Sequence, residues 1–175
     1  MLIMGKGNIY LWTGNGAGKS SSALGVALRT IAHNKKVVVI QFLIARKFLG
    51  EYKIRKRLGH NYKIYQFGRN AWINPNNLNE LDRKIAHNGL EFAKEVVQKE
   101  RPFLLVLDEI NLALSFGLLN TREVLNFLRK VPRNTRVYLI GRNAPYELRN
   151  FADYVNEIVL VKRPKGWKPT KGIEF

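Results

Sequence analysis

The sequence of 175 residues predicts an α/β domain of three layers, with helices on both faces of a mostly parallel central sheet. Segments rich in apolar and β-branched residues alternate with segments whose apolar residues recur at helical spacing. In addition, the segments 36–40 and 103–107 are almost continuously apolar, which is typical of parallel strands that are covered on both faces. The alternation of strands and helices then implies right-handed crossover connections.

The expected elements follow one another along the chain without an internal repeat. The clearest helix pattern lies at 78–97, where one apolar stripe runs along the helix. Asn120 and Glu123 form a capping pair just before another helix pattern, and Pro145 is favoured at the first position of a helix. The expected strands are 9–13, 37–42, 62–67, 103–108, 136–140 and 155–161, and the expected helices include 78–97, 110–116, 124–128 and one beginning at Pro145.

A glycine-rich turn, TGNGAGKS at 13–20, lies between the first expected strand and an apolar helix pattern. This is the context of a phosphate-binding loop, in which backbone N–H groups and a helix N-terminus point at one triphosphate. Lys19 adds a positive charge on the outer phosphates, and the hydroxyl of Ser20 is a ligand for Mg²⁺. The usual motif has Gly where this chain has Thr13, so an ordinary glycine-rich turn is the alternative. The predicted ATP-binding residues are Asn15, Gly16, Ala17, Gly18, Lys19, Ser20, Ser21 and Arg142.

Two carboxylates, Asp108 and Glu109, end the apolar strand candidate at 103–107. The carboxyl ends of parallel strands line the crevice where ligands bind, so these side chains are expected to face the glycine-rich turn and to hold Mg²⁺ directly or through water. The alternative is an acidic cap on the helix that follows. Arg142 ends another strand and either stabilises charge on a phosphate or pairs with a helix carboxylate. Together these motifs predict a P-loop NTPase-like domain that binds Mg²⁺ and ATP.

Charge and composition narrow the possible partners. The chain has 30 Lys and Arg against 13 Asp and Glu, and the resulting charge of +17 attracts polyanions. Basic groups at 46–47, 53–57 and 162–165 either contact nucleic acid or form solvated surface, and the lack of any accompanying nucleic-acid motif favours the second interpretation. The chain has no cysteine, which excludes disulfides and favours the cytoplasm. No stretch of about 20 apolar residues is long enough to span a membrane, and no secretory signal is indicated.

The domain boundary is expected near the end of the last strand. Residues 1–161 are expected to form the nucleotide-binding α/β domain. Residues 162–175 are rich in Lys, Pro and Gly and are expected to form a tail that packs on or near the site. The three histidines are scattered without the spacing of metal ligands.

Taken together, the motifs resemble the P-loop-type ATP:corrinoid adenosyltransferases, which act on cob(I)alamin or cob(I)yrinic acid a,c-diamide. The resemblance covers nearly the whole chain. Enzymes of that family transfer the 5′-deoxyadenosyl group of ATP to the Co(I) of a corrinoid and release triphosphate. The matching segments are 10–21, 39–43, 50–51, 68–72, 106–110, 141–145, 161–162 and 172–175.

The resemblance implies roles for particular residues. It assigns catalysis to Lys19, Ser20 and Glu109, and binding of Mg²⁺ to Ser20, Glu109 and Asp108. Because Co(I) is itself a strong nucleophile, the enzyme needs no general base. Its main tasks are to hold C5′ in line with cobalt and to stabilise triphosphate as the leaving group.

The resemblance also implies a corrinoid site, which keeps water and a lower ligand off the cobalt. Trp72 matches the family's tryptophan, and Phe67 and Asn70 are the other predicted corrinoid contacts. The chain departs from the family's usual residues at Ala17, where Lys is common, and at Asn70, where an aromatic is usual. A homodimer is implied as well, and a flavoprotein is the candidate reductant.

Two other functions remain as alternatives at this point. The first is a P-loop ATPase or small-molecule kinase, which would release phosphate or ADP rather than triphosphate. The second is a basic, ATP-dependent nucleic-acid-binding protein, whose affinity for oligonucleotides would fall steeply with salt.

Overall fold

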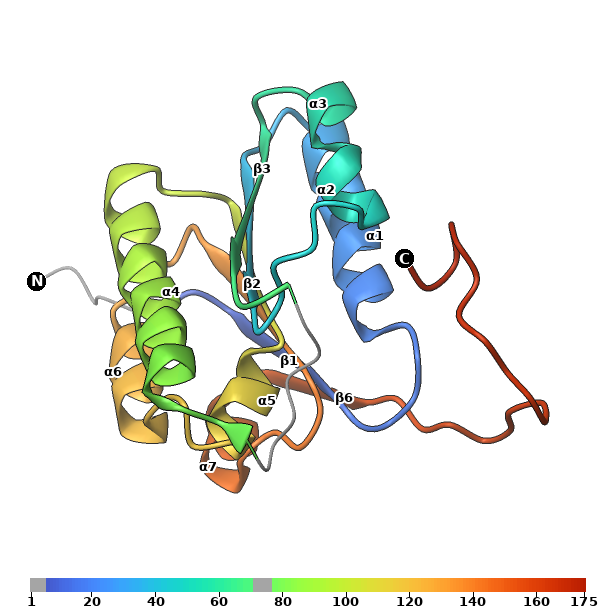
Figure 1. Cartoon of the computed structure of the whole chain (residues 1–175). Helices are drawn as coiled ribbons and strands as arrows, with labels where there is room; N and C mark the ends of the chain where they lie inside the picture. The colour runs from blue at the N-terminus through green and yellow to red at the C-terminus, as the bar shows by residue number, and fades with distance from the viewer. Residues whose placement is uncertain (1–5, 71–76) are drawn as a thin grey trace, which may run out of the picture.

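The computed structural model describes residues 6–70 and 77–175. Its central sheet has six strands in the order β3-β2-β4-β5-β1-β6, and every neighbouring pair is parallel (Figure 1). The three-layer α/β fold predicted from the sequence is therefore confirmed. The strands are β1 (Ile9–Thr13), β2 (Val37–Phe42), β3 (Tyr62–Phe67), β4 (Leu104–Asp108), β5 (Arg136–Ile140) and β6 (Tyr154–Glu157).

The last strand is shorter than the sequence predicts and ends at Glu157 rather than residue 161. The reason is a change of direction: Ile158 leaves the sheet and contacts the glycine-rich turn. Its N–H donates to the carbonyl of Thr13 at 2.9 Å, and its carbonyl accepts from the N–H of Gly16 at 2.8 Å. The chain beyond the sheet therefore supports the glycine-rich turn.

Two layers of helices cover the sheet, each with its own apolar core (Figure 1). On one face lie α1 (Lys19–Ala32), α2 (Gly50–Lys53) and α3 (Arg55–Leu58). On the other face lie α4 (Glu80–Lys99), α5 (Ile110–Ser115), α6 (Thr121–Arg129) and α7 (Tyr146–Phe151). Alternate residues of each strand face the two layers, so the position of a residue in its strand decides which layer its side chain meets.

Helix α4 is fixed at its start by a buried carboxylate. Asn79 and Asp82 form a reciprocal capping box, in which each side chain accepts from the backbone N–H of the other. Asp82 also accepts from two nitrogens of Arg69, one of them Nε at 2.6 Å. This pairing holds the pKa of Asp82 below its usual value, because the hydrogen bond from Arg69 favours the charged form.

Asp82→Asn is expected to lower the stability of the protein by about 1–3 kcal/mol at neutral pH, because an amide cannot accept both guanidinium bonds. Because the pKa of Asp82 is lower in the folded than in the unfolded protein, its charged form stabilises the fold at pH values above the unfolded-state pKa of 3.8. This stabilisation is lost as the pH falls through the folded-state pKa. The gap in melting temperature between wild type and variant should therefore narrow in acid. Glu80→Gln is the matched control, since that exposed carboxylate lies in the same helical turn. Equal melting temperatures for Asp82→Asn and wild type at neutral pH would contradict the assignment.

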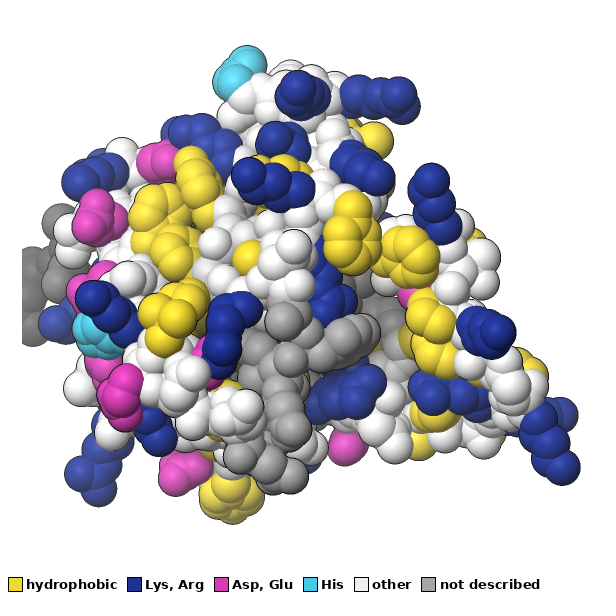
Figure 2. Space-filling model, in the orientation of Figure 1, with side chains coloured by type: hydrophobic (Ala, Val, Ile, Leu, Met, Phe, Trp, Pro, Cys, Tyr) yellow, Lys and Arg dark blue, Asp and Glu magenta, His cyan; other side chains and the backbone are white. Residues whose placement is uncertain are grey.

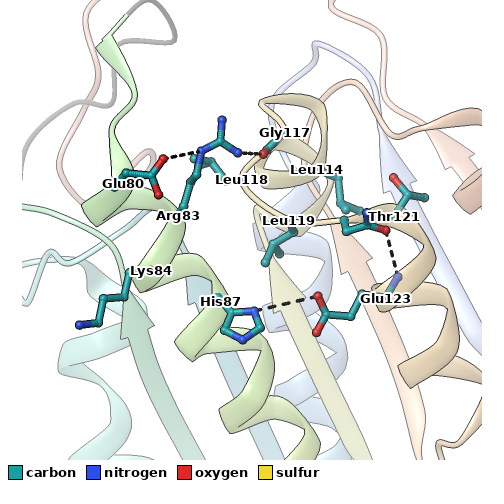
Figure 3. A pocket seen from close by; sticks show the side chains of 11 residues that line it. Glu80, Arg83, Lys84, His87, Leu114, Gly117, Leu118, Leu119, Thr121 and Glu123 are labelled. Carbon is teal, nitrogen blue, oxygen red and sulfur yellow. Dashed lines mark hydrogen bonds and ion pairs between the residues drawn. The ribbon is translucent and has the colours of Figure 1, made fainter.

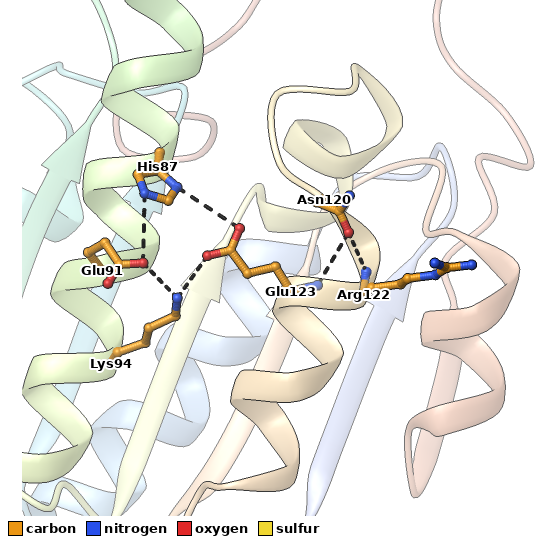
Figure 4. A network of polar contacts seen from close by, with 6 residues as sticks. All are labelled: His87, Glu91, Lys94, Asn120, Arg122 and Glu123. Atoms are coloured by element: carbon orange, nitrogen blue, oxygen red, sulfur yellow. Dashed lines mark hydrogen bonds and ion pairs between the residues drawn. The ribbon is translucent and has the colours of Figure 1, made fainter.

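A polar network joins α4 to α6 (Figure 4). Lys94 donates to Glu91 at 2.6 Å and to Glu123 at 2.8 Å. Asn120 caps α6 as predicted, because its Oδ1 accepts from the N–H groups of Arg122 and Glu123. The Glu123 carboxylate, however, is paired with Lys94. Glu123 thus ties two helices of one layer together.

Candidate active site

The glycine-rich turn connects β1 to α1, as predicted. Gly14 and Gly18 have φ angles of 92° and 101°, which side chains other than glycine rarely adopt. A Cβ on Gly14 would also lie 2.3 Å from the carbonyl oxygen of Ile158. The turn therefore needs glycine for its own conformation and for its close contact with the segment after β6.

Thr13 occupies the position where the usual motif has glycine, and the structure explains this departure. Thr13 is the last residue of β1 and is fully buried. Its Oγ1 accepts from the N–H of Ala144 at 3.2 Å. The hydroxyl thus satisfies a buried donor in the segment after β5, and the turn itself begins one residue later.

Lys19, the first residue of α1, lies under the turn. Its side chain is buried, and Nζ donates to the carbonyl of Gly16 at 2.6 Å. Burial lowers its pKa most, and the nearby charge of Arg142 lowers it further, while Glu109 and Asp108 oppose the shift. The ammonium group is thus held inside the turn, at the start of a helix.

The strand order brings two predicted carboxylates to this turn. Only β5 separates β1 from β4, so the carboxyl ends of these strands lie at one edge of the sheet. Asp108 accepts from Oγ of Ser20 at 2.9 Å and from Nε2 of Gln41 at 3.1 Å. Burial raises the pKa of Asp108, and these hydrogen bonds oppose the shift. Both carboxylate oxygens of Asp108 therefore accept a hydrogen bond from a side chain.

Glu109 differs from its neighbour because part of its carboxylate is unpaired. Its backbone is left-handed, with φ of 60°, and directs the chain from β4 into α5. Its Oε2 is buried and has no hydrogen-bond partner within the described ranges 6–70 and 77–175. Burial and the charge of Asp108 raise its pKa to about 7, although Lys19 and Arg142 lower it. An unpaired buried carboxylate beside a lysine is typical of a site that takes a ligand.

Two adjoining pockets meet at these residues. The P-loop pocket has a volume of about 540 Å³, and the second pocket, called here the β2-side pocket, has about 400 Å³. Ser20, Glu109 and Glu174 line both. The P-loop pocket is also lined by Gly16, Ala17, Gly18, Lys19, Ser21, Arg142 and Ile173. The β2-side pocket is also lined by Leu43, Ile44, Arg46, Leu49, Glu51, Asp108, Leu112 and Phe116.

Most of the predicted ATP-site residues line the P-loop pocket, but Asn15 does not. Its Oδ1 accepts from the N–H of Leu160 at 3.1 Å, so it holds the chain after β6. Arg142 is exposed at the rim of the pocket. The carboxyl end of the chain returns to the site, where the ring of Phe175 lies edge-on to that of Phe48 with centroids 6.0 Å apart.

Of the predicted corrinoid residues that the structure describes, Phe67 and Asn70, neither lines the P-loop pocket or the β2-side pocket. Phe67 packs on the opposite face of the sheet, with its ring centroid 5.4 Å from that of Phe92, and it closely approaches Gly89 of α4. Asn70 is exposed. Trp72 lies outside the described residues.

Several residues of the site were not predicted as functional. Gln41 and Gln66 lie one residue before the ends of β2 and β3; the buried Gln41 contacts Asp108, and Gln66 contacts Gln41. Asn111 is fully buried and donates to the carbonyls of Trp12 and Gly141, which joins the ends of β1 and β5. A polar residue at the end of an otherwise apolar strand is the signal that could have found Gln41.

A larger pocket, of about 790 Å³, lies between α4 and the α5–α6 connection (Figure 3). Its lining mixes both signs of charge, with Arg83 donating to the carbonyl of Gly117 and pairing with Glu80. His87 lies near Glu123 across this pocket (Figure 3). It contains none of the predicted site residues.

The basic side chains are spread over several elements. Figure 2 shows Lys and Arg over the α2–α3 region and along the C-terminal tail, with apolar and acidic side chains between other basic groups. Among the described residues, no helix combines the length and apolar character that crossing a membrane requires.

Comparison with known proteins gives one consistent family. Residues 5–175 match the model of the family described as ATP:corrinoid adenosyltransferase BtuR/CobO/CobP. A corrinoid adenosyltransferase of a Sinorhizobium species is 37% identical over 97% of this chain and 81% of its own length. A corrinoid adenosyltransferase of Pseudomonas aeruginosa is 32% identical over 97% of this chain and 84% of its own.

A solved structure resembles the chain in fold. The flagellar accessory protein FlaH of Methanocaldococcus jannaschii superposes with a TM-score of 0.59 over 88% of this chain and 72% of its own, at 14% identity. That likeness concerns the fold alone. The match along almost the whole sequence shows that the chain belongs to the ATP:corrinoid adenosyltransferase family.

Proposed function

We propose that this protein transfers the 5′-deoxyadenosyl group of ATP to the Co(I) of a corrinoid at the junction of the P-loop pocket and the β2-side pocket. In this reaction a bond forms between cobalt and C5′, the bond between C5′ and the triphosphate oxygen breaks, and triphosphate leaves. The observation that carries the proposal is the unpaired carboxylate of Glu109, which lies beside Lys19 in the wall shared by both pockets.

The P-loop pocket supplies positive charge for the leaving triphosphate. Lys19 donates to the carbonyl of Gly16 and would exchange this contact for a phosphate oxygen. Arg142 provides a second cation at the rim. The backbone N–H groups of the turn and the start of α1 add further donors. Such preorganised groups stabilise charge that develops on a leaving group.

Mg²⁺ fits the oxygen donors of the site. Oε2 of Glu109 is buried and has no partner among the residues that the structure describes, and Oγ of Ser20 lies at the start of α1 with its hydrogen directed to Asp108. Both are hard oxygen ligands of the type that Mg²⁺ prefers. Bound there with the nucleotide, the ion would neutralise charge on the triphosphate. Asp108 orients the hydroxyl of Ser20, so we propose that Asp108 does not contact the ion itself and instead positions the ligand Ser20.

The β2-side pocket is the proposed approach for the corrinoid. Apolar side chains such as Leu43, Leu49 and Phe116 line it next to Ser20 and Glu109, which suits the apolar face of a corrin macrocycle. Trp72 and Asn70 stay proposed contacts of the ring. Phe67 is assigned a packing role beneath this end of β3, because its ring lies against α4.

Anaerobic incubation with Mg²⁺, ATP and chemically reduced cobalamin tests the proposal. The expected products are triphosphate and a light-sensitive adenosylated corrinoid. Release of phosphate or ADP without a cobalt–carbon product would instead favour an ATPase or a kinase. Tight oligonucleotide binding with a steep dependence on salt, in the absence of adenosyl transfer, would favour the nucleic-acid alternative.

The finer assignments are tested separately. We propose a homodimer in the cytoplasm that receives electrons from a flavoprotein. Light scattering would measure the mass of the particle in solution. Reduction of Co(II) by candidate flavoproteins would identify the electron donor.

We propose that the tail at 162–175 completes the site, because Ile173 and Glu174 line the P-loop pocket. Removal of residues 173–175 is therefore expected to raise the KM for ATP with little change in melting temperature, since these residues bury little of the core. Steady-state kinetics of the truncated and complete chains measures the effect. Ile173→Ser and Glu174→Gln, made singly, separate the two contacts. An unchanged KM in the truncated chain would contradict a role for the tail.

A further inference from the structure

Three polar side chains lie side by side at the carboxyl ends of three neighbouring strands. The parallel register places Gln41 of β2 opposite Asp108 of β4 on one side and Gln66 of β3 on the other. Each occupies the same face of its strand as residues that pack against α1, such as Val39, Val106 and Ile64. The row therefore points toward the layer that carries Ser20.

The amide of Gln41 is fully engaged in this row. Its Nε2 donates to Oδ2 of Asp108 and to Oε1 of Glu51, both at 3.1 Å. Its Oε1 accepts from Nε2 of Gln66 at 2.9 Å. The two carboxylates fix the orientation of the Gln41 amide, because the reversed orientation would direct its oxygen at both of them.

The row connects the two pockets of the site. On one side Asp108 accepts from Ser20, the proposed ligand of Mg²⁺. On the other side Glu51 lines the β2-side pocket, and Gln66 also donates to the carbonyl of Arg46, another residue of that pocket, at 3.3 Å. A neutral amide with two donors holds two carboxylates close together without adding charge, whereas a third carboxylate at this position would repel both.

We propose that Gln41 is a positioning residue for adenosyl transfer, which holds Asp108 against Ser20 and holds Glu51 at the wall of the β2-side pocket. The inference rests on the function proposed above and deepens it. Gln66 supports Gln41 by donating to the amide oxygen that this orientation turns away from the carboxylates. Ser20 with Asp108, at the proposed Mg²⁺ site, and Glu51, in the β2-side pocket, are therefore both positioned by Gln41. A substitution of Gln41 alters both parts of the site.

Gln41→Met tests this role, because methionine keeps the length and removes every hydrogen bond of the amide. Calorimetric titration with ATP in the presence of Mg²⁺ is expected to show binding weakened by up to about 10-fold, because Gln41 acts one step behind Asp108, the partner that orients the ligand Ser20. The same titration with a chelator in place of Mg²⁺ is expected to match wild type. Gln41→Glu is expected to weaken Mg²⁺-dependent binding at least as much.

Thr135→Val is the matched control. Thr135 is as buried as Gln41 and donates to the carbonyl of Pro102 at 2.7 Å, just before β5 at the other end of the sheet. Thr135→Val is expected to lower the melting temperature without changing the dependence of ATP binding on Mg²⁺. A purely structural role for Gln41 would give this same pattern and would overturn the proposal.

Gln66→Leu provides a second measurement that does not depend on the folding of Gln41→Met, because Gln66 is only partly buried. It is expected to change ATP binding in the same direction by a smaller factor, and the double variant should lose less than the product of the two effects. Wild-type, Mg²⁺-dependent ATP binding in both single variants would overturn the proposal. Failure of wild type to form an adenosylated corrinoid would instead refute the proposed function, while the binding titrations would still decide the role of Gln41.

Discussion

Lys19→Ala is expected to reduce kcat/KM for adenosyl transfer by about 10²- to 10³-fold, which corresponds to about 2.7–4 kcal/mol of transition-state stabilisation. The reason is that its ammonium group is buried inside the turn, at the place where the triphosphate would leave. Burial and the charge of Arg142 lower the pKa of Lys19, which shows that its charged form is unfavourable at this position. Removing the side chain relieves that cost, and the melting temperature should not fall.

Steady-state kinetics with chemically reduced cobalamin measures the effect of Lys19→Ala, and circular dichroism checks that the fold is kept. Lys99→Ala is the control, because that exposed lysine pairs only with Glu95 on the outside of α4 within the described part of the chain. Near-normal turnover by Lys19→Ala would remove the turn from the mechanism.

Glu109→Gln is expected to slow the reaction by a similar factor and to raise the Mg²⁺ concentration needed for half-maximal rate. The amide keeps the shape of the side chain but loses the charge of its unpaired oxygen. Asp108→Asn should raise the Mg²⁺ requirement less, because Asp108 acts through Ser20. The opposite order of severity, measured as rate against Mg²⁺ concentration, would make Asp108 the ligand.

The same Glu109 variant is expected to be more stable than wild type in the absence of ligands. Burial and Asp108 raise the pKa of Glu109 from 4.5 to about 7, so the folded protein holds a proton that the unfolded chain has released. Wild type therefore loses stability as the pH rises from about 4.5 to about 7. Glutamine has no proton to lose. The melting temperature of Glu109→Gln should exceed that of wild type above this range and approach it at lower pH.

Thermal denaturation without ATP or Mg²⁺ over a pH series tests this gain in stability. A melting temperature of Glu109→Gln that stays below wild type throughout the series would show that the carboxylate is stabilising. Lower activity together with higher stability in the variant would indicate that the Glu109 carboxylate serves the reaction and lowers the stability of the folded protein.

The parts of the site that the sequence predicts are local in the chain. Gly14 and Gly18 mark the turn because their backbone angles exclude most other residues. Lys19 and Ser20 then follow at the start of α1, and an apolar strand leads directly to Asp108. Each of these features is recognisable from a few consecutive residues, so these parts of the site can be predicted without knowing the order of the strands in the sheet.

The contacts that the sequence did not predict depend on register between distant segments. Gln41 meets Asp108 across 67 positions of sequence and meets Gln66 across 25. Such contacts follow only once β2, β3 and β4 are known to be parallel neighbours. The placement of Phe67 follows from the same alternation, since a residue next to Gln66 in a strand must face the other layer.

The strand order also makes the pairing of β1 depend on strands that are synthesised much later. β1, which leads into the glycine-rich turn, pairs with β5 and β6, beginning with Ile9 opposite Val137 and Tyr10 opposite Tyr154. The first of these six strands to be synthesised therefore pairs only with the last two, and its apolar residues are exposed to aggregation in the meantime. Ile158, which holds the glycine-rich turn through Thr13 and Gly16, follows β6, so a nascent chain that stops before β6 lacks this support of the turn.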